Sequence, residues 1–280
     1  MFRIVRKEPL HDTVTLMEIE APRIAKKALP GQFIILRIDE KGERIPLTVA
    51  GCDKLAGTVA IIFQKVGATT QRLDKLNAGE YLLDFVGPLG KPSEFDGYAG
   101  KKVCVIGGGL GIAIAYPQAK ALHAIGADVD IIVGFRSTDL FILVDELQNA
   151  CNNLYVMTDD GSNGHKGFVT TALRRQLDAG VKYSLVVAIG PLVMMRAVCD
   201  LTKEADINTI ISMNPIMIDG TGMCGCCRLT VGGQTKFACV DGPDFDGRQV
   251  DFEEAIVRSR MYKKEEAEIL HRCNLTGEVR

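Results

Sequence analysis

The chain has 280 residues, a length that predicts two or three domains. Apolar residues make up 47% and charged residues 24% of the chain, which is the composition of a globular protein and excludes disordered, collagen-like and coiled-coil proteins. Thirty-three Lys and Arg residues against 35 Asp and Glu residues leave a net charge of -2 without any basic run, so the composition excludes nucleic acid as a partner.

The sequence also predicts a cytoplasmic protein that has no membrane partner. Gly, Lys or Asp interrupts every apolar stretch before it reaches the roughly 18 to 20 residues of a membrane helix. The N-terminal residues alternate charge and hydrophobe and lack the apolar core of a signal peptide. Three of the nine cysteines, Cys224, Cys226 and Cys227, fall within four positions, and in a reducing compartment such a cluster is typical of a metal site.

The first domain is predicted over residues 1–99 as an all-β antiparallel barrel. Runs with period-2 alternation recur about every 8 to 15 residues, without a long helical pattern between them. These runs are residues 2–10, 13–20, 31–40, 45–52, 57–66 and 80–90. The segment 87–100, rich in Gly and Pro, is predicted to be a linker.

The second domain, residues 100–210, is predicted to be an α/β domain with a parallel sheet. A continuous apolar strand that begins at Lys102 runs into a glycine turn and an alanine-rich helix. Further buried strands are expected at 128–135, 153–158 and 184–191, with helical patterns between them. This alternation of strand and helix is typical of a parallel sheet that is covered on both faces.

The last part, residues 211–280, is predicted to be a cluster-binding segment and a C-terminal helix. Its first half, residues 214–247, is rich in Cys and Gly and reads as loops. A polar helical pattern follows over residues 251–273, and we expect this helix to cover a neighbouring domain.

The strongest motif for chemistry is Asp219-x4-Cys224-x2-Cys227-x11-Cys239. A tight loop with three anionic ligands and one more distant thiolate is the arrangement of plant-type ferredoxins, with Asp219 standing where their first Cys would be. A carboxylate has the charge of a thiolate and can bind iron through oxygen. The motif therefore predicts an iron-sulfur cluster.

Other ligand sets stay open at this point. Cys226 could replace Cys227, and zinc could bind Cys224, Cys227, Cys239 and a fourth group. Zinc ribbons usually have a second closely spaced pair of cysteines, which this chain lacks, so the sequence favours iron and sulfide over zinc or unligated thiols. The cysteines in strand and helix patterns are predicted to be small core residues: Cys52, Cys104, Cys151 and Cys199.

A second motif is the glycine string from Gly107 to Gly111, between a predicted strand and a predicted helix. Glycines allow the backbone to approach a pyrophosphate, and the N-terminus of the following helix favours an anion. The alternative is a tight turn without a ligand. The string is not a clean G-x-G-x-x-G, and the next strand ends at 134–137 without an acidic residue, so a standard dehydrogenase domain is not expected.

A third motif lies in the barrel, where Arg44 and Thr48 share one strand. Such a pair can hold a phosphate and the edge of a ring, although an exposed arginine without a ligand is the alternative. The turn 67–70, Gly-Ala-Thr-Thr, offers further N–H and hydroxyl donors for a phosphate.

Taken in order, these motifs resemble the ferredoxin-reductase-like electron-transfer subunits over nearly the whole chain. The phrases VGPLGKP, GFRS, TDDGSNGHKGFVT, AIGPLVMM and DGTGMCGCCRLTV carry the resemblance. The small (alpha) subunit of NADH-dependent ferredoxin:NADP oxidoreductase and the sulfide dehydrogenase small subunit are similar in this way. The electron-transfer subunit of dihydroorotate dehydrogenase shares the layout but has Cys in place of Asp219.

The resemblance implies FAD on the barrel, a nicotinamide nucleotide on the α/β domain, and a 2Fe-2S cluster. The residues implied for FAD are Arg44, Pro46, Leu47, Thr48, Thr69 and Thr70. Those implied for the nucleotide are Gly108, Gly109, Gly111, Arg136, Asp159, Asp160, Gly190, Pro191 and Met194. The implied cluster ligands are Asp219, Cys224, Cys227 and Cys239, and Cys226 stands where related chains more often have a small residue.

The implied function is an oxidoreductase subunit that passes electrons between NAD(P)H, FAD and the cluster. The resemblance also implies a partner, a larger glutamate-synthase-like flavin and iron-sulfur subunit that gives or receives these electrons. Ferredoxin is reached indirectly, through the heterodimer of the two subunits. No general base is expected, and His165 is interpreted as a turn residue. NAD(H) is expected over NADP(H), although Arg136 and Ser137 could also receive a 2'-phosphate. The alternatives are a dihydroorotate dehydrogenase subunit and a non-catalytic redox sensor or zinc protein; electron bifurcation stays open.

Overall fold

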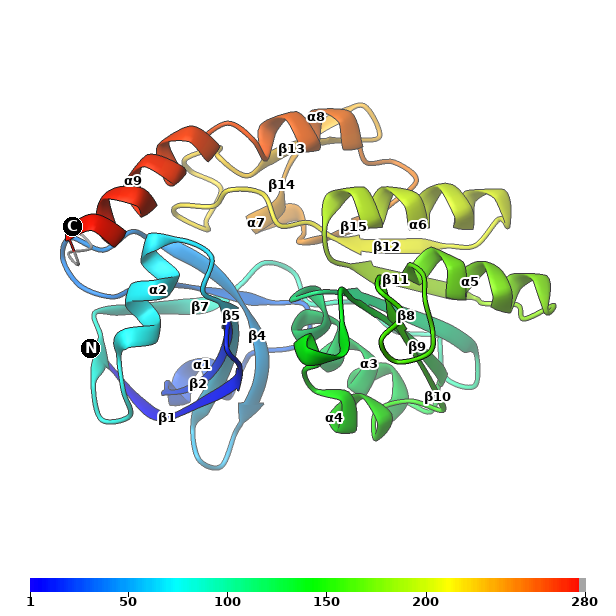
Figure 1. Ribbon diagram of the computed structural model, residues 1–280, viewed down its shortest axis with the longest axis horizontal. Coiled ribbons are helices and arrows are strands. Elements are labelled where there is room, and N and C mark those ends of the chain that lie inside the picture. Colours follow the sequence, from blue (N-terminus) through cyan, green and yellow to red (C-terminus); the bar gives the residue numbers. More distant parts are fainter. Residues whose placement is uncertain (277–280) are drawn as a thin grey trace.

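The structure is a computed structural model that describes residues 1–276, with the side chains of residues 1–271. Its three parts lie in chain order in Figure 1: an antiparallel β-structure in blue and cyan, an α/β sheet in green, and a C-terminal segment in yellow to red. The C-terminal segment returns across the top of the other two parts, so that α9 (Lys263–Thr276) lies beside α2 (Ala68–Lys75) of the first part.

The first part is a seven-stranded antiparallel sheet with the order β6-β1-β2-β5-β4-β3-β7. The two edge strands, β6 and β7, follow each other in the chain, separated only by Leu83, so the sheet curls into a near-barrel. Alternate residues of its strands point inward and form a core that includes Ile4, Met17, Phe63 and Phe85. The strands are β1 (Phe2–His11), β2 (Val14–Glu20), β3 (Phe33–Arg37), β4 (Ile45–Asp53), β5 (Thr58–Gln64), β6 (Tyr81–Leu82) and β7 (Asp84–Leu89).

Two details of the barrel differ from the sequence-based prediction. The Gly-Ala-Thr-Thr segment 67–70 begins α2, because Thr70 caps this helix and so a helix replaces the expected turn. The predicted linker 87–100 begins too early, because residues 87–89 belong to β7 and pair with β3. The barrel also contains α1 (Pro22–Ala25).

The second part is a six-stranded sheet with the order β10-β9-β8-β11-β12-β15, parallel except at β15. This arrangement confirms the predicted fold class of an antiparallel barrel followed by an α/β domain with a parallel sheet. Its strands are β8 (Lys102–Gly108), β9 (Asp128–Phe135), β10 (Asn153–Thr158), β11 (Leu185–Ile189), β12 (Thr209–Ser212) and β15 (Asp244–Asp246).

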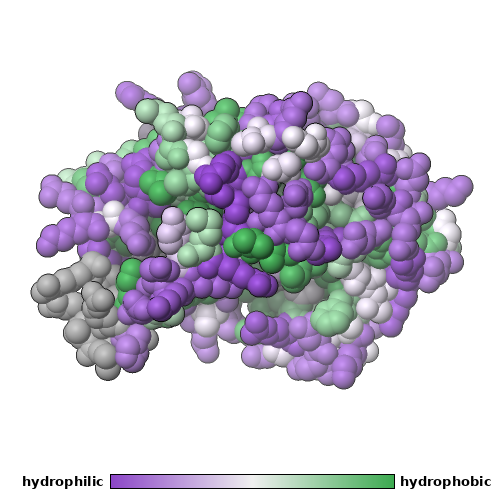
Figure 2. Space-filling model, turned by 90° about the horizontal axis from the view of Figure 1, so that it is seen from above, coloured by the Kyte–Doolittle hydropathy of each residue, from purple (hydrophilic) through white to green (hydrophobic). Residues whose placement is uncertain are grey.

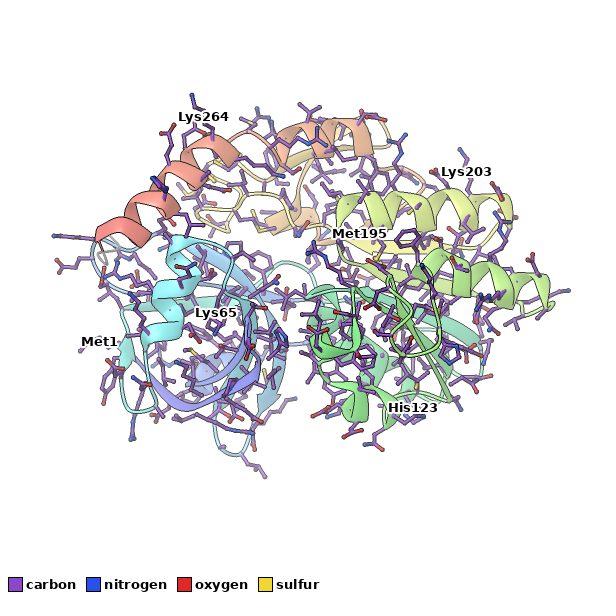
Figure 3. All side chains as sticks on the ribbon, in the orientation of Figure 1. Met1, Lys65, His123, Met195, Lys203 and Lys264 are labelled. Carbon is purple, nitrogen blue, oxygen red and sulfur yellow. The ribbon has the colours of Figure 1, made fainter. Side chains whose placement is uncertain are left out.

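Helices cover both faces of this sheet, as the continuous apolar strands require. Successive residues of β8 face opposite ways: Val103 and Val105 belong to one buried cluster, and Cys104 and Ile106 to the other. Side chains fill both layers, with Met195 fully buried at the inner side of α6 (Figure 3). The helices are α3 (Gly111–Ala124), α4 (Val144–Gln148), α5 (Val169–Asp178) and α6 (Leu192–Glu204), with a short 3-10 turn at Thr138–Leu140.

The C-terminal segment is more structured than the loops and single helix that its sequence predicts. A hairpin and a short helix, α7 (Ala238–Asp241), follow the cysteine-rich loop, and β15 then joins the edge of the parallel sheet. The polar helical pattern is broken at residues 259–262 into α8 (Phe252–Arg258) and α9. The hairpin strands are β13 (Arg228–Val231) and β14 (Gln234–Phe237).

The boundaries 1–99, 100–210 and 211–280 stay predictions, and residues 277–280 lie outside the described part of the chain. Seen from above, the face that carries α8 and α9 is mostly hydrophilic, with apolar side chains scattered among the charged ones (Figure 2). Within residues 1–276, no helix has both the length and the apolar character that a bilayer crossing requires.

Candidate functional site

The four predicted cluster ligands lie in two pairs. The sulfur atoms of Cys227 and Cys239 are 3.3 Å apart, and both residues are buried. The sulfur of Cys224 lies 3.4 Å from a carboxylate oxygen of Asp219, and this pair is nearer the surface. Cys239 lies near the start of α7, and this short helix brings its thiol to Cys227 in the loop, twelve positions earlier in the chain.

Backbone N–H groups surround the more exposed pair. Asp219 accepts hydrogen bonds from the N–H groups of Thr221, at 3.1 Å, and Cys224, at 3.0 Å. Partial burial opposes the charged form, but these bonds outweigh it and lower the pKa of the Asp219 carboxyl. The N–H of Cys226 likewise lowers the pKa of the Cys224 thiol. Both groups of this pair are thus held in an environment that favours their anionic, metal-binding forms.

The buried pair has a different electrostatic environment. Burial raises the pKa of Cys239 to about 12, and the neighbouring Cys227 thiol adds to this rise. The N–H of Gly222 in the loop faces the Cys239 sulfur and acts in the opposite direction. A thiol of this kind gives up its proton when a metal ion takes the proton's place.

This arrangement suits a cluster of two iron ions better than a single ion. In a 2Fe-2S cluster each iron takes two protein ligands, so the protein must supply two pairs. Among residues with described side chains, no three His, Cys, Asp or Glu groups converge closely enough to hold one metal ion, as a zinc site would need. The assignment of Asp219, Cys224, Cys227 and Cys239 as ligands stays a prediction.

The cluster loop is seated on the barrel. A side chain at Gly220 would collide with the ends of Ile35 on β3 and Leu89 on β7, at 2.7 and 2.8 Å, so glycine is required at this approach. Arg44 donates from Nε to the carbonyl oxygen of Ile218, at 3.0 Å, directly before Asp219. The barrel and the cluster loop are therefore in direct contact, although 174 positions separate Arg44 and Ile218.

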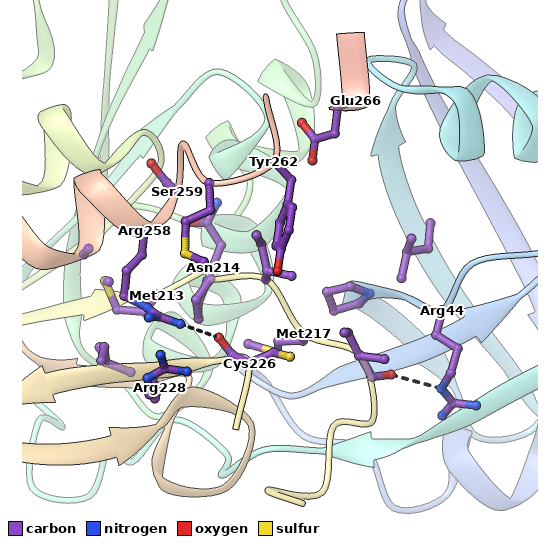
Figure 4. Close-up of a pocket in the computed structure, with 18 of the residues that line it drawn as sticks. Arg44, Met213, Asn214, Met217, Cys226, Arg228, Arg258, Ser259, Tyr262 and Glu266 are labelled. Carbon is purple, nitrogen blue, oxygen red and sulfur yellow. Dashed lines mark hydrogen bonds between the residues drawn. The ribbon is translucent and has the colours of Figure 1, made fainter. Parts of the chain in front are cut away.

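A cavity of about 730 Å³ lies between the barrel, the cluster loop and the C-terminal helices (Figure 4). Its volume is within the roughly 300 to 1,000 Å³ range of sites that hold a cofactor-sized ligand. Three segments far apart in the chain line it: residues 43–46 of the barrel, residues 213–218 before the cluster loop, and residues 255–269 of the C-terminal helices. Cys226 and Leu192 add the cluster loop and the start of α6 to its wall.

The predicted flavin residues divide into two groups. Arg44 and Pro46 line this cavity, whereas Leu47 and Thr48 are half-buried on β4 outside its wall. Thr69, near the start of α2, donates its hydroxyl to the carboxylate of Glu43, which also lines the cavity. The side chain of Thr70 bonds to the N–H and C=O of Gly67 and caps α2. The structure thus places an anion, the carboxylate of Glu43, beside these residues at the N-terminus of α2.

The predicted nucleotide residues come together at the carboxyl ends of the strands of the parallel sheet. The glycine string ends β8 and leads into α3, Arg136 follows β9, Asp159 and Asp160 follow β10, and residues 190–194 follow β11. The chain proceeds from β8 to β9 and β10 on one side and then returns to β11 and β12 on the other. The crevice between β8 and β11 is therefore the point where the strand order reverses, which is the usual ligand position in open α/β sheets.

The glycines of this crevice have separate roles. A side chain at Gly111 would meet the carbonyl oxygen of Ile189 at 2.3 Å, so this glycine allows α3 to pack against β11. At Gly108 the space is already filled by the sulfur of Met194, 2.3 Å from an added Cβ. Gly109 is exposed and has a positive φ of 54°, with nothing within 4 Å of an added Cβ, so its backbone is open to a ligand.

Sequence reasoning missed the contribution of the C-terminal helices to the cavity. Tyr262, half exposed, points into it from the break between α8 and α9, and Arg258, Glu266 and Ile269 also line it. The polar pattern of this segment predicted only a covering helix. The aromatic residue within that polar run, at the helix break, is the signal that could have indicated a ligand pocket.

Comparison with known proteins finds relatives both of the cluster-binding segment and of nearly the whole chain. Residues 214–251 match the iron-sulfur cluster binding domain of dihydroorotate dehydrogenase B. The chain is 45% identical to the dihydroorotate dehydrogenase B (NAD(+)) electron transfer subunit homolog of Thermotoga maritima, over 94% of this chain and 92% of the relative. The chain belongs to the family of dihydroorotate dehydrogenase B electron-transfer subunits and their homologues.

Other members of this family are similar over different lengths. The uncharacterized protein in the adh 3' region of Clostridium beijerinckii is 51% identical, over 95% of this chain and 92% of that protein. The electron transfer subunit of Clostridium perfringens dihydroorotate dehydrogenase B is 34% identical, over 79% and 87% of the two chains. The chain is thus an oxidoreductase electron-transfer subunit with the ferredoxin-reductase-like fold.

A solved structure adds a more specific likeness. A chain from the structure of NADH-dependent reduced ferredoxin-NADP oxidoreductase, described in connection with flavin-based electron bifurcation, superimposes with a TM-score of 0.93. The two chains are 42% identical, over 99% of this chain and 98% of the other. This match confirms the resemblance found in the sequence. A ferredoxin NADP+ reductase from Neisseria gonorrhoeae, 16% identical with a TM-score of 0.58, shares the fold.

Proposed function

We propose that this chain is the small, electron-transfer subunit of an NADH-dependent ferredoxin:NADP oxidoreductase. It binds FAD in the cavity between the barrel and the C-terminal helices, NADH at the crevice of the α/β sheet, and a 2Fe-2S cluster at the two ligand pairs. FAD can exchange two electrons with a nicotinamide and single electrons with an iron-sulfur cluster, which is the chemistry it supplies when bound. The protein itself positions these groups and excludes water.

One observation carries this proposal: the cavity and the cluster loop share a wall. Cys226, between two predicted ligands, lines the same cavity as Arg44 and Pro46 of the barrel. Arg44 in turn holds the carbonyl of Ile218 next to Asp219. A flavin bound there would lie against the cluster loop without an intervening domain, which suits direct electron transfer between the two groups.

The residues of the cavity support flavin binding rather than acid-base chemistry. The cavity has apolar surface for a ring system, which comes from Pro46, Met213, Met217 and Leu229. Arg44 supplies a cation at the barrel side. Next to Glu43, at the same barrel wall, α2 offers a helix N-terminus and the Thr69 hydroxyl, where a pyrophosphate would compete with Glu43. The chain needs no general base for hydride transfer, because the nicotinamide and the flavin carry that chemistry.

The charges at the nucleotide crevice favour NADH over NADPH. Asp159 and Asp160, both exposed, follow β10, and Arg136 follows the neighbouring strand β9. The N–H of Asp160 donates to the carbonyl of Arg136, at 3.2 Å, so these residues are held together. The hydrogen bond from Ser162 lowers the pKa of Asp160, which keeps this carboxylate charged. Two carboxylates disfavour the extra phosphate of NADPH, whereas Arg136 alone would attract it.

A larger flavin and iron-sulfur subunit completes the proposed enzyme and handles NADP(H) and ferredoxin. The match to the NADH-dependent ferredoxin-NADP oxidoreductase structure supports this partner, because it extends over almost all of both chains. We place the assembly in the cytoplasm as a heterodimer. Electron bifurcation belongs to the proposal as a property of the whole assembly, with this chain as its NADH-dependent branch.

A second candidate is the electron-transfer subunit of a dihydroorotate dehydrogenase. The named relatives from Thermotoga maritima and Clostridium perfringens favour it. The oxidoreductase structure covers 99% of this chain, against 94% and 79% for these two relatives, which favours the first candidate, although its 42% identity lies between their 45% and 34%. Asp219 also favours the first candidate, since we expect Cys at this position in the dehydrogenase subunits.

The experiment that tests the proposal is anaerobic purification followed by counts of iron, sulfide and flavin per chain. We expect about two irons, two sulfides and one FAD. Flavin bleaching is then timed after mixing with NADH or NADPH. Faster bleaching by NADPH would contradict the nucleotide preference, and zinc without flavin would contradict the function. Reconstitution with a dihydroorotate dehydrogenase catalytic subunit separates the candidates, because only the second predicts dihydroorotate-dependent NAD reduction.

A further inference from the structure

Two arginines hold the backbone between the predicted ligands Cys224 and Cys227. Arg258, half-buried on α8, donates from Nη2 to the carbonyl oxygen of Cys226, at 3.1 Å (Figure 4). Arg228, just after the loop, donates from Nη1 to the carbonyl oxygen of Gly225, at 3.3 Å. The loop carbonyls that separate the two ligands are thus each paired with a guanidinium.

These guanidinium groups keep their positive charge largely uncompensated by carboxylates. None of the ion pairs within the described part of the chain includes Arg258 or Arg228. Other surface arginines nearby are paired, as Arg196 is with Glu253 at 2.6 Å. The positive charges of Arg228 and Arg258 therefore act on the loop and on the group that the loop binds.

The geometry of the peptide bond extends this effect to the ligands. In a planar trans peptide the C=O and the N–H point in opposite directions. Arg228 holds the carbonyl of Gly225, so the N–H of the same peptide, at Cys226, points away from this arginine. By the same rule, Arg258 holds the carbonyl of Cys226 and turns the N–H of Cys227 to the opposite side of that peptide.

We propose that Arg258 is a positioning residue that fixes the cluster loop from α8 and raises the reduction potential of the bound cluster. This inference rests on the proposed function, because it takes the two ligand pairs to hold a 2Fe-2S cluster. A cluster with four anionic ligands becomes more negative when it accepts an electron. The guanidinium and the N–H groups of the loop would stabilise the more negative, reduced form of the cluster relative to the oxidised form, and this raises the reduction potential.

The position of Arg258 also links the cluster to the flavin cavity. Arg258 lines this cavity together with Tyr262, Glu265 and Glu266, which follow it in the chain. The same segment, from α8 to α9, therefore contacts both the cofactor cavity and the cluster loop. A change at Arg258 acts on the cluster through the Cys226 carbonyl without removing any predicted ligand.

The test is a redox titration of the anaerobic holoprotein, followed by electron paramagnetic resonance of the reduced cluster, with iron and flavin counted in each variant. Arg258→Gln removes the charge, Arg258→Lys retains it, and Arg260→Gln is the matched control, because Arg260 is exposed two positions away on the same segment. We expect Arg258→Gln to lower the reduced-to-oxidised ratio at a fixed applied potential by roughly tenfold, about 59 mV for one electron. Arg258→Lys should restore most of this loss, and Arg260→Gln should leave the ratio unchanged.

A second variant keeps the test decisive if Arg258→Gln fails to assemble its cluster. Arg228→Gln removes the neighbouring guanidinium without altering α8, and we expect a shift in the same direction. An unchanged potential in every variant that retains the cluster would overturn the inference. Wild-type protein without iron and sulfide would instead contradict the proposed function, so the two failures are distinguishable.

Discussion

The sulfur atoms of Cys227 and Cys239 lie 3.3 Å apart in a buried position, whereas Cys226 turns its sulfur toward the carbonyl of Cys224, 3.9 Å away. This difference favours Cys227 over Cys226 as the predicted ligand. We expect Cys227→Ser and Cys239→Ser each to lower bound iron by roughly tenfold or more, because a hydroxyl is a poor substitute for a thiolate. Cys226→Ser should retain its iron, measured by metal analysis after anaerobic purification. Iron loss confined to Cys226→Ser would reverse the assignment.

Asp219 offers a separate test of the exposed pair. Replacing it by Cys retains an anionic ligand, so we expect full iron content with a shifted reduction potential. Replacing it by Ala removes the ligand and should lower the iron content by roughly tenfold or more. Asp241, a carboxylate that accepts a hydrogen bond from the N–H of Phe237, provides the control Asp241→Asn. Equal iron content and equal potential in both Asp219 variants would remove this residue from the site.

Much of the architecture was predictable because it depends on local patterns. The alternation of apolar residues in residues 2–90 and the continuous apolar strands from Lys102 onward determine which faces are buried, so both sheets could be predicted. The spacing of the cysteines likewise indicated a cluster loop. The addition of β15 to the parallel sheet was not predictable, because a strand of three residues carries no pattern of its own.

The cavity was only partly predictable because it is formed by segments distant in the chain. Arg44 and Pro46 could be predicted from the barrel motif, but Glu43, Tyr262 and Arg258 contribute through tertiary packing. Glu43 and Arg258 stand in charge-rich segments, so nothing local distinguishes them from ordinary surface residues, and only the aromatic side chain of Tyr262 is a local signal. Single positions of this kind require the structure.

Glu43 gives a prediction about flavin affinity. Its carboxylate accepts the hydroxyl of Thr69 near the N-terminus of α2, where an incoming pyrophosphate would bind. Glu43→Gln removes a competing negative charge worth about 1 kcal/mol at a helix N-terminus, so FAD should bind roughly fivefold more tightly. Fluorescence titration of flavin-free protein measures this change, with Glu40→Gln, on the exposed turn nearby, as the control. Weaker binding by Glu43→Gln than by Glu40→Gln would show that Glu43 itself helps to hold the cofactor.

Gly111 gives a prediction about the stability of the α/β domain. An added Cβ would lie 2.3 Å from the carbonyl oxygen of Ile189, so Gly111→Ala must push α3 away from β11. We expect a loss of about 1 to 3 kcal/mol in the free energy of unfolding, measured by urea denaturation. Gly51→Ala is the control, because its nearest neighbour would be the Cβ of Ala60, at 3.9 Å. A loss in the control as large as that in Gly111→Ala would contradict the steric explanation.

The three parts of the molecule meet at a buried polar cluster around Asp244 of β15. One carboxylate oxygen of Asp244 accepts the hydroxyl of Ser93, at 2.6 Å, and the amide of Gln118 on α3, at 3.3 Å. Its other oxygen and the amide oxygen of Gln118 are buried without a hydrogen-bond partner among the described residues. Burial raises the pKa of Asp244, and the hydrogen bond from Ser93 only partly offsets this effect.

This raised pKa makes stability depend on pH in a definite direction. The folded state retains the Asp244 proton at a pH where the unfolded chain, with its ordinary pKa of 3.8, has lost it. The contribution of Asp244 to stability is therefore full below that value, and it falls as pH rises toward the folded-state pKa. Asp244→Asn stays neutral and can place an amide donor beside the unpaired oxygen of Gln118, so at pH 8 we expect its free energy of unfolding to exceed that of the wild type by about 1 to 3 kcal/mol. Chemical denaturation at several pH values measures this difference, which should shrink toward pH 4; an equal loss of stability at every pH would show that Asp244 is needed as a carboxylate.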